Sequence, residues 1–131
     1  MKQFLLIITV IGISSTVFAE LSEAQKQKVD SYENECMVKT GVARDVVEKA
    51  QQGTLIDDPK LKAFAFCISK KIGLQNEKGE VQIEALKEQL PSLVENPEQD
   101  KDLIASCLGD SKDPEEIAFH TYICYYKANP N

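Results

Sequence analysis

The sequence has few of the residues and motifs that catalysis requires. It contains one histidine, His120, no tryptophan, no Gly-x-Ser-x-Gly motif and no glycine-rich loop. A Ser-His-Asp triad, a lysozyme-like scaffold and a phosphate-binding loop are therefore not indicated. A single histidine does not make a zinc site, and no Asp-x-Asp-x-Asp-Gly loop offers oxygen ligands to calcium. Glu115 and Glu116 point about 100° apart on a helix and are expected to be capping groups. We predict no enzyme activity, no metal and no cofactor.

The sequence has fewer basic than acidic residues. Lysine and arginine total 15 and aspartate and glutamate total 21, which gives a formal net charge of −6. An acidic chain repels phosphate backbones and anionic lipid surfaces, so no nucleic-acid partner is expected. No stretch beyond the N-terminal segment is apolar enough to cross a bilayer, so stable membrane insertion is not expected either.

Residues 1–19 have the features of a secretory signal peptide. Lys2 gives a positive start, an apolar run covers Phe4 to Ile13, and Val17-Phe18-Ala19 forms a small-x-small cleavage site. The run is too short for a membrane span, although an uncleaved anchor is the alternative. We predict a secreted, extracellular protein whose mature part, residues 20–131, is one domain.

The four cysteines all lie in this mature part, and none is part of a Cys-x-x-Cys motif. An even number of cysteines in a short secreted chain indicates a disulfide framework. The wide spacing disfavours a zinc ribbon and a thioredoxin-like redox site, both of which need close pairs. The cysteines are Cys36, Cys67, Cys107 and Cys124.

The hydrophobic pattern is helical from end to end. Its clearest stripe runs from Leu61 to Ile72 at i, i+3, i+4, i+7 and i+11, after the Asp58-Pro59 pair, which favours a helix start. Capping boxes at residues 22–25, 96–99 and 113–116 mark further starts. Predicted helix stops are Gly41, Gly53, Gly73 and Pro91. We predict an all-α fold of six short helices, each of eight to eighteen residues.

Tyrosines and aliphatic residues on the later helices are candidates for a binding surface. A tyrosine offers a hydroxyl beside an apolar ring, which suits a wall that orients one polar end of an apolar ligand. The alternative is that these side chains fill a packed core, because periodicity does not separate a core from a cavity. The predicted ligand-binding residues are Phe64, Ile68, Leu86, Leu90, Ile104, Leu108, Phe119, Tyr122, Ile123 and Tyr126. His120, beside this set, is either a pH sensor in the pocket or an ordinary helix-side histidine.

The signal peptide, the acidic helical domain and the cysteine spacing together resemble the insect odorant-binding proteins of the pheromone-binding/general-odorant-binding type. The full family pattern has six cysteines, and Ala63 and Glu115 stand here at the two missing positions. Those two cysteines bond to each other in the family, so their joint absence is self-consistent and is typical of the Minus-C subclass. Residues 57–62 and 66–68 also resemble beetle members from haemolymph and male accessory glands.

The resemblance implies six helices around a closed apolar cavity, with disulfides Cys36–Cys67 and Cys107–Cys124. It implies a carrier that reversibly binds odorants, pheromones or lipid-like molecules, with no enzyme activity and no cofactor. The expected site of action is sensillar lymph, haemolymph or a glandular secretion, so olfaction is one of several roles. The alternative is a secreted, disulfide-stapled interaction protein that acts through an exposed apolar patch. A weak homodimer is left open.

Overall fold

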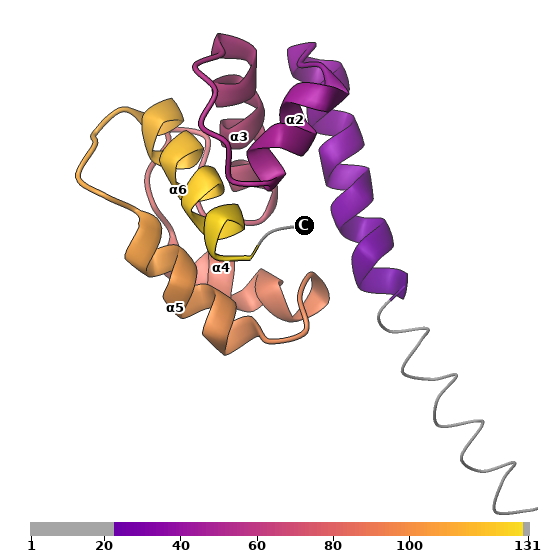
Figure 1. Ribbon diagram of the computed structural model, residues 1–131. Coiled ribbons are helices and arrows are strands. Elements are labelled where there is room, and N and C mark those ends of the chain that lie inside the picture. The colour runs from indigo at the N-terminus through magenta and orange to yellow at the C-terminus, as the bar shows by residue number, and fades with distance from the viewer. Residues whose placement is uncertain (1–22, 130–131) are drawn as a thin grey trace, which may run out of the picture.

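The computed structural model describes residues 23–129, which form six α-helices and one short 3-10 turn (Figure 1). The first helix covers residues 23–40 of this range. The others are α2 (Arg44–Gln51), α3 (Pro59–Lys71), α4 (Ile83–Gln89), η1 (Leu90–Ser92), α5 (Pro97–Cys107) and α6 (Pro114–Ala128). An isolated antiparallel bridge between Gln75 and Val81 is the one β-type pairing in the described range. The predicted all-α fold of six helices is confirmed, whereas the signal peptide, its cleavage site and the Ser22 cap lie outside the described residues.

Two helix starts form as the Asp-Pro pairs predict. The Asp58 side chain accepts a hydrogen bond of 2.8 Å from the Lys60 backbone N–H at the start of α3. Asp113 does the same for α6, accepting from the Glu115 backbone N–H at 3.0 Å. The proline at the first helical position of each helix loses no hydrogen bond, since its N–H would have no intrahelical partner.

The Asn96 cap and the return bond of the 113–116 box do not form, while Ser22 of the 22–25 box lies outside the described residues. The Gln25 amide donates to two backbone carbonyls of the 91–94 segment, at 3.2 and 3.1 Å. The Asn96 side chain makes no cap hydrogen bond. The Glu116 carboxylate accepts from the Lys62 ammonium at 2.8 Å. The Asp113 backbone N–H donates to the Ser111 hydroxyl at 3.2 Å, so Glu116 has a tertiary partner in place of that N–H.

One helix is shorter than predicted. Helix α4 has seven residues and ends at Gln89, and the chain continues through Leu90–Ser92 as a 3-10 turn. The helix thus ends two residues before the predicted stop at Pro91, and its length is one residue below the predicted minimum of eight. Helix α2 begins at Arg44, two residues beyond Val42. Gly41 reverses the chain there with a φ of +74°, which favours glycine.

Helix α6 contacts α2, α3 and α5, and among the helices α2 to α6 its contact with α3 is the most extensive (Figure 1). The buried apolar side chains form two separate clusters. The larger cluster joins the first helix, α2, α3 and α6, and it includes Phe64 and Phe119. The smaller consists of Leu74, Leu86, Leu90 and Ile104, with partly buried neighbours around it.

Two disulfides join pairs of helices. Cys36–Cys67 joins the first helix to α3, and Cys107–Cys124 joins the end of α5 to α6. This is the pairing that the family resemblance implies. Within residues 23–129 no helix is both long enough and apolar enough to cross a membrane.

Candidate ligand-binding cavity

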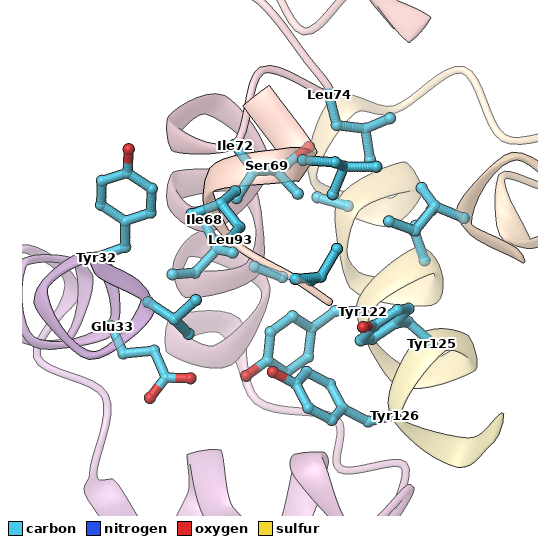
Figure 2. Close-up of a pocket in the computed structure, with 17 residues that line it drawn as sticks. Tyr32, Glu33, Ile68, Ser69, Ile72, Leu74, Leu93, Tyr122, Tyr125 and Tyr126 are labelled. Atoms are coloured by element: carbon cyan, nitrogen blue, oxygen red, sulfur yellow. The ribbon is translucent and has the colours of Figure 1, made fainter. Parts of the chain in front are cut away.

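A cavity of about 120 Å³ lies among the first helix, α3, α5, α6 and the segment around Leu90–Val94 (Figure 2). Its wall is overwhelmingly apolar, with few oxygen atoms. An apolar protein cavity of roughly 150 Å³ holds a benzene molecule, so a benzene-sized apolar group sets the scale of what this cavity accepts.

The cavity exists because the two hydrophobic clusters do not merge. Ala65 on α3 and Ala118 on α6 belong to the larger cluster and reach its wall. Leu74, Leu90 and Ile104 belong to the smaller cluster and form the opposite part of the wall. Methyl groups at both alanine positions leave space that larger side chains would fill.

The structure places five of the ten predicted ligand-binding residues in this wall. They are Ile68, Leu90, Ile104, Tyr122 and Tyr126. The other five, which are not part of it, are Phe64, Leu86, Leu108, Phe119 and Ile123. Phe64 and Leu86 are completely buried and Phe119 is 3% exposed, so they are packed core. Leu108 packs against the smaller cluster, and Ile123 borders a shallow hollow beside His120 and Leu55.

The predicted ligand-binding residues do not include those that the first helix and the segment after η1 contribute to the wall. The first helix contributes Val29, Tyr32 and Glu33, and the segment after η1 contributes Leu93 and Val94. Val29 and Tyr32 lie on the apolar stripe of the first helix, a signal that could have identified them. The segment after η1 is irregular, so no periodicity marks it.

One end of the cavity is polar. The Gln51 amide Nε2 donates to the Glu33 carboxylate Oε1 at 2.9 Å and to the Tyr122 hydroxyl at 3.1 Å. The rings of Tyr122 and Tyr126 lie 4.8 Å apart between centroids, and Figure 2 shows their hydroxyls together on the side from which Glu33 extends its carboxylate. Glu33, Tyr122 and Tyr126 thus form a polar cluster, which we call the polar end.

Burial changes the acid–base properties of these groups. It raises the pKa of Tyr122, and it raises the pKa of Tyr126 to about 12, with the charge of Glu33 acting in the same direction on both. Both hydroxyls therefore keep their protons at neutral pH and can donate hydrogen bonds. Burial also raises the pKa of Glu33, because its charged form is only partly solvated.

Three other polar side chains of the wall have hydrogen-bond partners in the protein, and Figure 2 shows the Tyr32 hydroxyl pointing away from the other lining side chains. The Ser69 hydroxyl donates to the Gln75 side chain at 2.6 Å. The Thr121 hydroxyl donates to a carbonyl of its own helix at 2.7 Å. The Tyr125 hydroxyl donates to Asp100 at 2.7 Å. The polar end is thus the part of the wall that is suited to a ligand head group.

His120 lies outside this cavity. Its side chain is 54% exposed, and its Nε2 is 3.1 Å from a Glu116 carboxylate oxygen one helical turn away. It borders the shallow hollow with Leu55 and does not line the cavity. No group of three or more potential metal ligands occurs in residues 23–129.

An apolar cavity with one polar end, inside a disulfide-linked helical domain, is what a carrier of small apolar molecules requires. Residues 18–128 match the PBP/GOBP family, and the chain belongs to that family. Because its members are binding proteins, the chain is a carrier of small hydrophobic ligands and not an enzyme. The four cysteines fit the Minus-C subclass, which stays a prediction.

Individual relatives agree with this assignment. The chain is 35% identical to the B1 protein of Tenebrio molitor over 97 residues, which cover 74% of this chain and 75% of the relative. It is 28% identical to general odorant-binding protein 69a of Drosophila melanogaster over 119 residues, or 89% and 79% of the two chains. The solved structure of the THP12 carrier protein from yellow meal worm is similar with a TM-score of 0.55 and 32% identity, covering 70% of this chain and 84% of that one.

Proposed function

We propose that the 120 Å³ cavity is the ligand site, and that a secreted mature domain of residues 20–131 uses it to carry apolar molecules reversibly through an extracellular fluid. The observation that carries this proposal is an apolar space between two core clusters, with a single polar end. A fully packed core would have no reason to leave such a space beside a polar cluster.

The size of the cavity sets the expected affinity. A benzene-sized molecule that buries roughly 200 Å² of apolar surface at about 25 cal/mol per Å² gains ~5 kcal/mol. That free energy corresponds to a dissociation constant of about 0.2 mM, and a head group held at the polar end would tighten it. Affinity of this order permits release, which suits a carrier.

The names of the relatives support odorants and other small lipid-like molecules as the ligand class. One relative is a general odorant-binding protein and another is a carrier protein. Sensillar lymph, haemolymph and a glandular secretion are all compatible with such a carrier, and the tissue of expression would distinguish them.

Action through a surface patch has less support. Val38 and Leu55 are the exposed large apolar residues of the described range, with exposed fractions of 86% and 63%. Val38 is near the end of the first helix, and Leu55 is in the connection between α2 and α3. Isolated exposed side chains of this kind are normal on soluble proteins and do not make a docking surface.

Calorimetric titration with toluene tests the proposal. Ala65→Leu and Ala118→Leu each place three extra carbons in the wall, so toluene binding should be lost while the protein stays folded. Leu55→Ser is the matched control, because it removes an exposed apolar side chain outside the wall. Binding that survives both alanine replacements and disappears in Leu55→Ser would contradict the cavity site and support the surface alternative.

A further inference from the structure

We propose that the polar end of the cavity selects ligands with a hydroxyl head group over ligands with a carboxylate. This inference rests on the proposed function, because it requires the cavity to be the ligand site. It goes further by assigning the chemistry of the head group to named atoms on the first helix and α6.

The Gln51 amide uses both of its hydrogens in bonds within the protein. Gln51 is 8% exposed, and its Nε2 donates to Glu33 and Tyr122 at 2.9 and 3.1 Å. An amide nitrogen carries two hydrogens, so both are used. Gln51 thus holds the Glu33 carboxylate and the Tyr122 hydroxyl at the same end of the cavity.

Glu33 and Tyr126 each offer a polar atom to a ligand at this end of the cavity. Gln51 binds Glu33 through Oε1, and Glu33 also lines the cavity, which leaves Oε2 as an acceptor at the polar end. The Tyr126 hydroxyl, beside that of Tyr122 in Figure 2, supplies a donor. A hydroxyl both donates and accepts. An alcohol can therefore donate to Glu33 and accept from Tyr126 at once.

The charges around the polar end disfavour a ligand with a carboxylate head group. A carboxylate ligand would place a second negative charge beside Glu33, and the lining residues include no lysine, arginine or histidine to offset it. Arg44, the nearest basic influence on Glu33, is on α2 and donates to Asn34 at 3.2 Å, while Asp30 adds further negative charge. An ester could accept from Tyr126 but would leave the Glu33 carboxylate without a new donor. The expected order of affinity is alcohol, then ester, then carboxylate.

The acid–base behaviour of Glu33 agrees with this order. Burial and the charge of Asp30 raise the pKa of Glu33, while the hydrogen bond from Gln51 and the charge of Arg44 act against them. A carboxylate whose charge is poorly solvated gains most from a new hydrogen-bond donor. A ligand hydroxyl supplies that donor.

Calorimetry with three ligands of matched size tests the inference on the oxidised mature protein at pH 7.5. Toluene has no hydrogen-bonding group and reports on the cavity alone, while hexan-1-ol and hexanoate differ only in their head groups. We expect hexan-1-ol to bind at least about tenfold more tightly than hexanoate, a ratio that corresponds to ~1.4 kcal/mol. Glu33→Gln should remove most of this ratio and change the affinity for hexanoate relative to toluene. Tyr126→Phe should weaken hexan-1-ol binding more than toluene binding.

The matched control is Glu48→Gln, which removes the same charge from an exposed position on α2, outside the wall. It should keep the wild-type ratio, so that a change in Glu33→Gln reflects position and not net charge. Toluene binding with equal affinities for hexan-1-ol and hexanoate would overturn the head-group inference alone. An unchanged ratio in Glu33→Gln would do the same. Absence of toluene binding would overturn the proposed function and this inference together.

Discussion

Replacing Phe119 with alanine tests whether this residue belongs to the packed core or to the cavity wall. Phe119 is 3% exposed and belongs to the larger cluster, and the Lys62 ammonium lies 5.6 Å from its ring centroid. It is not part of the cavity wall. Removing a buried phenylalanine side chain costs roughly 3–5 kcal/mol, and loss of the cation–π contact adds at most about 1 kcal/mol. We expect Phe119→Ala to lower the free energy of unfolding by that amount and to change toluene affinity by less than about threefold, the factor that corresponds to ~0.7 kcal/mol.

The assay is urea unfolding of the oxidised protein, paired with toluene calorimetry on the folded state. Because single domains have only about 5–15 kcal/mol of stability, Phe119→Leu serves as a milder variant with a loss of roughly 1–2 kcal/mol. Ile68→Ala is the contrast, since Ile68 is half-buried and lines the cavity. It should shift preference from toluene toward propylbenzene at a smaller cost in stability. A changed ligand preference in the Phe119 variants with an unchanged urea midpoint would refute this reasoning.

Three further predictions concern stability. Burial raises the pKa of Glu33 above its ordinary value of 4.5, so the folded chain holds this proton more tightly than the unfolded chain; the contribution of Glu33 favours folding below pH 4.5 and is lost as the pH rises through the folded-state pKa. Calorimetric scans should therefore show Glu33→Gln stabilising the protein more at pH 7 than at pH 4, and the reverse order would contradict the sign. Replacing Cys107 and Cys124 with alanine opens a loop of 18 residues (124 − 107 + 1) and should cost about 3 kcal/mol in urea unfolding, so unchanged stability would count against the chain-entropy estimate. Gly79 has a φ of +84°, and a Cβ there would lie 2.4 Å from Pro114 side-chain atoms; Gly79→Ala should cost roughly 2–4 kcal/mol, and an unchanged melting temperature would contradict this.

The helices could be predicted from the sequence because their signals are local. The proline after Asp58 and the one after Asp113 set helix starts that the structure reproduces. Two of the capping boxes were predicted less well, because Asn96 makes no cap hydrogen bond and Glu116 binds Lys62 of a distant segment. A local pattern fixes where a helix begins, but not which distant group competes for a side chain.

The cavity was harder to predict for a related reason. An apolar stripe indicates that a side chain turns inward, but not whether atoms or empty space face it. Phe64 and Ile68 lie on one stripe of α3, yet Phe64 is fully buried core and Ile68 lines the cavity. The decisive residues include Ala65 and Ala118, whose small size leaves the space. Glu33 was missed because a glutamate on a helix surface usually faces solvent.

The most direct test of the ligand site is to locate bound hexan-1-ol by intermolecular nuclear Overhauser effects. We expect the alkyl chain to contact the methyl groups of Ile68 and Ile104 and the methylene next to its hydroxyl to contact the Tyr126 ring, since these residues line the cavity and its polar end. Leu55 and Ile123 line the shallow hollow outside the cavity. Contacts of the ligand to these two residues would contradict the cavity as the ligand site.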